Sequence, residues 1–179
     1  MKILYFASIY SPHDSKWINA IAKEHEVLVL YQPAELKIYM DESVPSKDIL
    51  PPFSLSRSGR ADCVNAINQI VEDFNPDIIH SMYIAPNSFW ASTISGIPHV
   101  ITTRGSDILV EYPSNYQNLN GRLSGMKHKV MDSWVKKSLK KASLVTSTSS
   151  QQARVVEKIS ATDTLVLRTG INLERIDQI

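Results

Sequence analysis

Short apolar runs alternate with segments of helical periodicity along the chain. The apolar runs have the length of buried strands, and we expect strands at 2–7, 26–31, 78–82, 98–103, 143–147 and 164–168. Apolar residues at helical spacing predict helices at 62–74, 86–96, 122–141 and 149–159, and one more that begins with Asp14 or Ser15 as its N-cap. Strands that alternate with helices are typical of βαβ units. We therefore expect an α/β fold, Rossmann-like and doubly wound, with a mainly parallel sheet and helices on both faces.

Two segments interrupt this alternation. Residues 32–60 contain four prolines and predict at most one weak strand, and residues 107–121 are rich in tyrosine and asparagine without clear periodicity. Long loops inside a compact domain are often functional, although a long surface loop without a function would have the same sequence pattern. In an open parallel sheet the binding crevice lies at the carboxyl ends of the strands, so we expect both loops on that rim.

Length and composition narrow the class of protein. The 179 residues suit one domain over 1–179, and 43% hydrophobic with 21% charged residues is ordinary for a globular chain. A formal net charge of +1 indicates no nucleic-acid partner. The single cysteine, Cys63, forms no internal disulfide, and the first apolar run is too short for a signal peptide or a membrane span. We expect a cytoplasmic protein.

Several motifs of catalysis and cofactor binding do not occur. The chain contains no G-x-G-x-x-G, no phosphate-binding G-x-x-x-x-G-K and no G-x-S-x-G. Its five histidines lack metal-ligand spacing, so we expect no metal site. These observations argue against a self-contained dehydrogenase, kinase, hydrolase or zinc enzyme.

Polar residues instead gather where the expected strands end, and they are candidates for a ligand-binding cleft. They are His13, Asp14, His80, Arg104, Gly105, Ser106 and Asp107. Each has a plain structural alternative. His80 could be a packing residue, Asp107 could cap a short helix, and Gly105 could serve only turn geometry.

Four segments carry a resemblance to a known family. They are Asn75-Pro-Asp-Ile-Ile-His80, Gly96-Ile-Pro-His-Val-Ile-Thr-Thr-Arg-Gly-Ser-Asp107, Lys140-Lys-Ala-Ser-Leu-Val-Thr-Ser-Thr-Ser149 and Val166-Leu-Arg-Thr-Gly-Ile-Asn172. In this order they resemble the N-terminal domain of family 4 glycosyltransferases. His13-Asp14 with Trp17 also resembles one subgroup of that family.

The resemblance implies one half of a GT-B fold, in which two Rossmann-like domains face each other. It implies a retaining glycosyltransferase that moves a sugar from a nucleotide-sugar to a glycan, lipid or small-molecule acceptor, without a metal. In that family the N-terminal domain binds the sugar or lipid-linked acceptor. The C-terminal domain binds the donor and carries two glutamates eight positions apart. This chain has no such pair. We therefore expect the C-terminal domain to be absent, no cofactor to be bound here and this fragment alone to be inactive, and we assign no catalytic residue.

A different class of function stays open beside the enzyme. The chain could be a non-enzymatic Rossmann-like binding module, or one subunit of a split transferase, because this fold serves many unrelated functions.

The chain departs from the family pattern at two places. Many members have two glycines after the first strand, where this chain has Ser11-Pro-His-Asp14. Many also have histidine where Arg104 stands. Arginine is no base at neutral pH, but it holds carboxylate or phosphate well, which predicts an anionic group near Arg104.

The helix expected at 122–141 carries a basic stripe. At 3.6 residues per turn, its four cations fall within an arc of roughly 40°. They are Arg122, Lys129, Lys136 and Lys140. An adjacent arc of Leu123, Met126, Val130 and Trp134 is expected to face the sheet. The stripe is either a solvated face or a contact with anionic lipid, which would make the protein peripheral at the inner face of the membrane.

Overall fold

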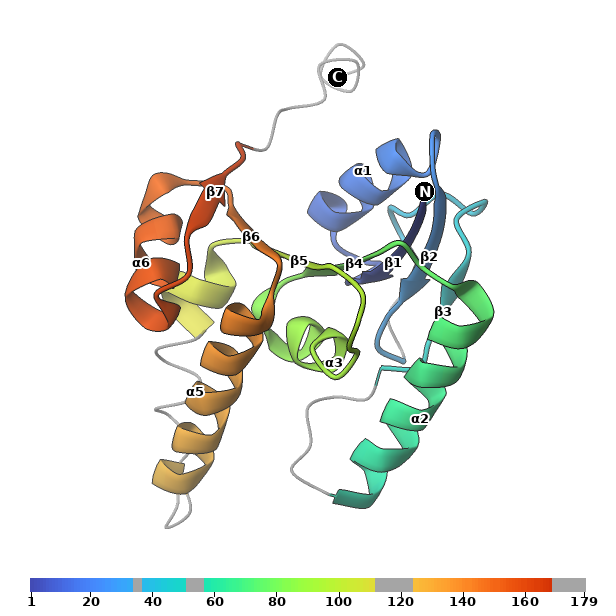
Figure 1. Ribbon diagram of the computed structural model, residues 1–179. Helices are drawn as coiled ribbons and strands as arrows, with labels where there is room; N and C mark the ends of the chain where they lie inside the picture. Colours follow the sequence, from blue (N-terminus) through green and yellow to red (C-terminus); the bar gives the residue numbers. More distant parts are fainter. Residues whose placement is uncertain (34–36, 51–56, 112–123, 169–179) are drawn as a thin grey trace.

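The computed structural model describes residues 1–33, 37–50, 57–111 and 124–168. Within these residues, seven strands form one sheet in the order β3-β2-β1-β4-β5-β6-β7, and every neighbouring pair is parallel (Figure 1). The strands are β1 (Lys2–Phe6), β2 (Glu26–Leu30), β3 (Ser46–Lys47), β4 (Ile78–Met82), β5 (His99–Thr103), β6 (Leu144–Ser147) and β7 (Thr164–Val166). The expected parallel α/β sheet is confirmed, and β3 is the weak strand expected in residues 32–60.

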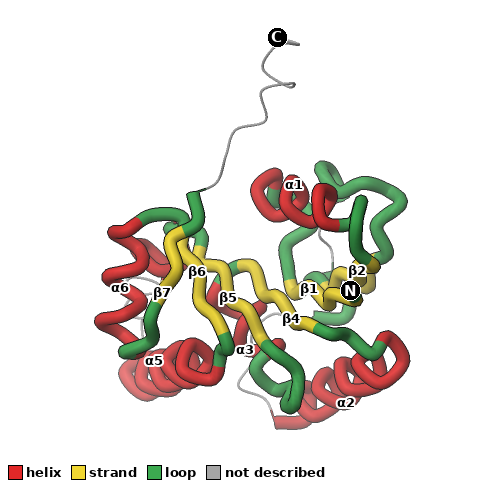
Figure 2. Tube along the Cα trace, turned by 45° about the horizontal axis from the view of Figure 1, so that its top comes forward, coloured by secondary structure: helices red, strands yellow, loops and turns green. Residues whose placement is uncertain are grey.

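Helices lie on both faces of the sheet. They are α1 (Pro12–Ile21), α2 (Arg57–Phe74), α3 (Phe89–Ala91), α5 (Ser124–Lys141) and α6 (Ser150–Ser160), with two short helical segments, η1 (Ile84–Ser88) and η2 (Ser106–Glu111). Figure 2 shows α1 above the sheet and α2, α3 and α5 below it. The expected doubly wound arrangement is confirmed.

Alternation along the strands divides the core between these two layers. Successive strand residues point to opposite faces, so Tyr5 packs with Ile18 of α1, whereas Leu4 and Phe6 pack with α2 and α3. A third group on the lower face joins β5 and β6 to α5 and α6 around Ile101, Val145, Val135, Leu139 and Val156.

The order of the strands reverses between β1 and β4. From β1 the chain winds outward through β2 to β3, then returns to place β4 on the other side of β1. The loops that follow β1 and β4 therefore leave the same sheet edge in opposite directions. Ligands of open parallel sheets bind in the crevice that forms at such a switch point.

Three local expectations were wrong. Ser11 is the N-cap of α1, with Pro12 after it, and not Asp14 or Ser15. The helix expected at 86–96 begins after the extended Ala85 as predicted, with η1 continuing into α3, but it ends at Ala91 and not near Gly96.

The third wrong expectation concerns the buried face of α5. The buried side chains are Met131, Val135 and Leu139, about 100° further round the helix than Val130 and Trp134. Trp134 lies at the side of the helix, stacked on Phe89 with ring centroids 4.7 Å apart. Leu123 lies outside the described residues, as does the side chain of Met126.

Candidate functional site

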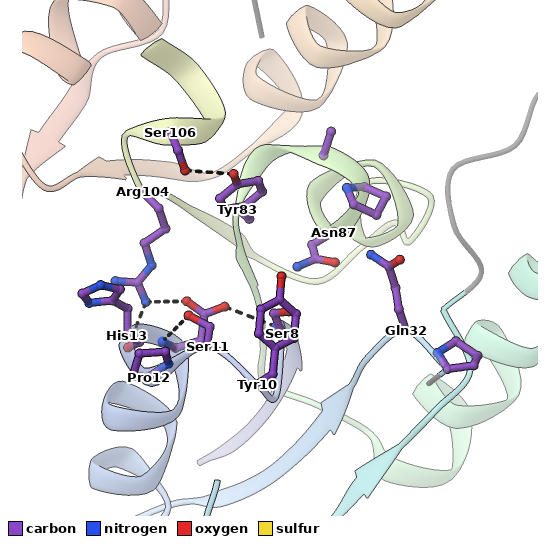
Figure 3. Close-up of a pocket in the computed structure, with 14 residues that line it drawn as sticks. Ser8, Tyr10, Ser11, Pro12, His13, Gln32, Tyr83, Asn87, Arg104 and Ser106 are labelled. Carbon is purple, nitrogen blue, oxygen red and sulfur yellow. Dashed lines mark hydrogen bonds and ion pairs between the residues drawn. The ribbon is translucent and has the colours of Figure 1, made fainter. Parts of the chain in front are cut away.

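A pocket of about 730 Å³ lies at the carboxyl edge of the sheet, above the switch point (Figure 3). This volume is within the range of about 300–1,000 Å³ that is usual for small-molecule sites. Its walls come from the loops that follow β1, β2, β4 and β5. The lining residues are Ser8, Tyr10, Ser11, Pro12, His13, Asp14, Gln32, Pro33, Tyr83, Ala85, Pro86, Asn87, Arg104 and Ser106.

A buried ion pair connects two of these walls. Arg104 Nη2 lies 2.9 Å from Asp14 Oδ1, and the two side chains are only 8% and 3% exposed. Arg104 Nη2 also donates to the His13 carbonyl at 3.3 Å. The second carboxylate oxygen of Asp14 accepts a hydrogen bond from the Ser8 amide at 3.2 Å. The loop after β5 is thereby held against the start of α1.

Opposing electrostatic effects act on the pKa of Asp14 in this pair. Burial raises the pKa of Asp14, while the Arg104 guanidinium and the Ser8 amide oppose that shift. Arg104 Nε and Nη1 have no hydrogen-bond partner among the described residues. The guanidinium therefore keeps two unused donors after it has neutralised Asp14.

Asp107 does not line the pocket but organises the loops behind it. Its Oδ1 accepts hydrogen bonds from the amides of Arg104 at 3.0 Å and Gly105 at 2.9 Å. Its Oδ2 accepts one from the Ile84 amide at 3.0 Å, in the neighbouring loop. Burial raises the pKa of Asp107 to about 6, against the lowering effect of these amides.

Two further residues of this loop have distinct roles. Gly105 has φ +105°, a backbone conformation that favours glycine, and a Cβ there would come within 2.8 Å of Nε2 at the end of the Gln152 side chain. Ser106 lies on the rim, where its hydroxyl is 2.9 Å from that of Tyr83. Tyr83 itself has φ +86°, a conformation that is strained for any residue with a side chain.

His80 lies within β4 rather than in a loop. Its Nε2 is 2.7 Å from Thr102 Oγ1, and its ring centroid is 5.0 Å from that of Tyr5. Burial, with a smaller effect of the Arg104 charge, lowers the pKa of His80 to about 3. It is a neutral ring packed in the sheet, in keeping with the structural alternative for this histidine.

The structure thus brings together four of the seven candidate residues in the pocket: His13, Asp14, Arg104 and Ser106. The other three, His80, Gly105 and Asp107, lie behind it. Among the described residues, the anionic group that Arg104 contacts is the Asp14 carboxylate. Ten lining residues were not among the candidates, and four of these have phenol or amide side chains: Tyr10, Gln32, Tyr83 and Asn87. Tyr10 and Gln32 closely follow β1 and β2, so the strand-end argument applied to every strand would have found them.

The basic stripe is only partly present on the described part of α5. Lys129 and Lys140 are exposed, whereas Lys136 pairs with Asp132 one helical turn away at 2.8 Å. Arg122 lies outside the described residues.

Across the described ranges, no helix is both long and apolar enough to cross a bilayer, and no group of three His, Cys, Asp or Glu residues could hold a metal ion.

A model of the family described as Glycosyl transferase 4-like matches residues 2–149. A comparison with curated protein sequences found no match.

Three solved structures illustrate what the fold is similar to. Sucrose-phosphate synthase from Thermosynechococcus elongatus has a TM-score of 0.67 and 14% identity over 97% of this chain and 49% of its own. A glycosyltransferase from Rickettsia africae has a TM-score of 0.61 and 15% identity over 98% and 45%. UDP-GlcNAc 2-epimerase from Neisseria meningitidis, bound to UDP-GlcNAc, has a TM-score of 0.58 and 14% identity over 93% and 46%. The chain therefore spans about half the length of these structures, and identities this low establish the fold alone.

The buried ion pair predicts a large asymmetry between single and double substitutions. Asp14→Ala should lower the free energy of unfolding by about 3–5 kcal/mol, because it leaves the Arg104 charge buried without its carboxylate. Asp14→Leu combined with Arg104→Met should recover most of this loss. Urea denaturation measures both values. Asp73→Ala, at an exposed position of α2, is the control, and an equal effect of Asp14→Ala and Asp73→Ala would contradict the prediction.

Asp107 predicts a pH dependence of stability with a definite sign. Its folded pKa of about 6 exceeds the value of about 3.9 expected in the unfolded chain, so between these values the folded state binds more protons. The stability that this group contributes is fully present below pH of about 4 and is lost as pH rises to about 6. The difference in unfolding free energy between wild type and Asp107→Asn should decline across that window and be level on either side. A difference that rises with pH would show that the amide hydrogen bonds outweigh burial.

Proposed function

Because this chain belongs to the glycosyl transferase 4-like family, we propose that it is the acceptor-side domain of a retaining glycosyltransferase. In this proposal a sugar passes from a nucleotide-sugar to a glycan, lipid or small-molecule acceptor. The observation that carries the proposal is the pocket at the switch point, where folds of this kind bind their ligands. The solved GT-B structures are about twice as long as this chain, which supports a second domain that binds the nucleotide-sugar.

The pocket residues have binding and positioning roles in this proposal. An arginine is no general base at neutral pH, but Arg104 lines the pocket beside Asp14 and has the role of positioning the acceptor. Asp14 fixes the guanidinium, and His13 and Ser106 border the same space. The domain contributes an oriented acceptor, and orientation is a large part of the rate enhancement in group transfer.

One other activity occurs among the solved structures that share this fold. UDP-GlcNAc 2-epimerases share the fold of this chain at a TM-score of 0.58, so a nucleotide-sugar epimerase is the second candidate. An epimerase acts without an acceptor, which separates the two activities experimentally.

The test is an assay of the full-length gene product with a panel of nucleotide-sugars and acceptors. We expect acceptor-dependent release of nucleotide, and no turnover by the 179-residue chain alone. Arg104→Met should lower kcat/KM by about 100-fold, the size expected when a group that orients the substrate is lost. Lys158→Met removes an exposed cation of α6 outside the pocket and should change nothing. Epimerised UDP-GlcNAc without an acceptor would favour the second candidate, and turnover by the short chain would contradict the division of roles.

We also propose that the exposed lysines of α5 draw the protein to anionic lipid. Each cation near such a surface contributes about 1 kcal/mol. The chain should co-sediment with vesicles that contain phosphatidylserine at low ionic strength and remain in solution with phosphatidylcholine alone. Reversing the two exposed charges of the basic stripe, Lys129→Glu with Lys140→Glu, should abolish binding. The same exchange at Lys23 and Lys158, exposed in other parts of the chain, is the control. No binding at low ionic strength would leave α5 as ordinary surface.

A further inference from the structure

Tyr10 is a large aromatic side chain left open inside a pocket. It follows β1, it is 54% exposed, and it lines the cavity. Among the described residues it has no hydrogen bond or ring contact. In Figure 3 its ring is drawn between Arg104 and His13 on one side and Gln32 on the other. A ring in this position offers a free π face to a ligand.

The charges around this ring cancel. Among the described residues that line the pocket, Arg104 and Asp14 are the only Arg, Lys, Asp or Glu side chains, and they form the buried pair. The other polar groups are hydroxyls and amides, together with the His13 ring. A phosphate dianion would place further negative charge near Asp14 with only one cation to offset both. The charges that line the pocket therefore disfavour a phosphate dianion.

We propose that the pocket binds an uncharged pyranose ring, the terminal sugar of the acceptor, stacked on Tyr10. One face of a pyranose presents C–H groups, whose hydrogens carry partial positive charge and complement the negative face of an aromatic ring. The sugar's edge presents hydroxyls, which both donate and accept hydrogen bonds. The Gln32 amide has no hydrogen bond among the described residues and supplies two donors and an acceptor. This assignment rests on the proposed function, since it names the substrate class of the same site.

Saturation-transfer NMR on the 179-residue chain tests the proposal with defined probes. The probes are methyl glycosides of glucose, galactose, mannose and N-acetylglucosamine, with glucose 6-phosphate, inorganic phosphate and uridine as competitors. We expect at least one methyl glycoside to bind, with transfer concentrated on the C–H protons of one ring face. Tyr10→Ala should weaken binding about fivefold to tenfold, as the loss of one aromatic contact predicts, and Tyr10→Phe should keep it within about twofold. Tyr39→Ala, an exposed tyrosine outside the pocket, is the matched control.

Three results would overturn the proposal. These are no binding of any neutral glycoside, equal effects of Tyr10→Ala and Tyr39→Ala, and displacement of the glycoside by uridine or phosphate at lower concentration than by a second glycoside. The outcome is separable from that of the transfer assay. Sugar transfer without Tyr10-dependent binding would refute this substrate assignment alone, whereas Tyr10-dependent binding by a full-length protein without transfer would refute the enzyme alone.

Discussion

Parallel strands can be joined only by crossovers that run over a face of the sheet, and this constraint determines where the pocket lies. Once the chain has wound from β1 outward to β3, its return to β4 must place the next loop on the other side of β1. The loops after β1 and β4 then diverge and leave an open crevice between them. Residues from four loops, separated by up to about half of the sequence, line one cavity as a result. Neither Tyr10 nor Arg104 would be near the other in a sheet wound in one direction.

Buried acidic groups convert this crevice into a defined site. Asp107 ties the loop after β5 to the loop after β4 through main-chain amides, so the two rims are held as one unit. Asp14 then fixes the Arg104 side chain against α1. The Asp107 carboxylate binds main-chain amides, whereas the Asp14 carboxylate binds the Arg104 side chain. Both carboxylates are therefore engaged in contacts within the protein. The ligand therefore meets a surface whose strongest charges are already matched.

Much of this arrangement could be predicted from the sequence, and the failures have physical causes. Strand positions were predictable because short apolar runs in a parallel sheet are buried on both faces. The buried face of α5 was not, because Trp134 and Val130 are as apolar as Val135 and Leu139, and tertiary packing alone chooses between the two arcs. The sequence predicted an anionic group beside Arg104, but the contact with Asp14 spans ninety positions and follows only from strand order. Tyr10 carries no motif, and its importance depends on its exposure within a concavity.

Tyr83 adopts a backbone conformation that glycine would adopt without strain. Holding a tyrosine at φ +86° costs of order 1–3 kcal/mol, which the surrounding structure must supply. Glycine at this position would relieve that cost and would lose the hydroxyl that meets Ser106 on the rim. Residue 83 is therefore a place where thermostability and ligand recognition favour different amino acids. Directed evolution under heat selection alone would drift toward glycine here, and a library meant to preserve binding should hold this codon constant.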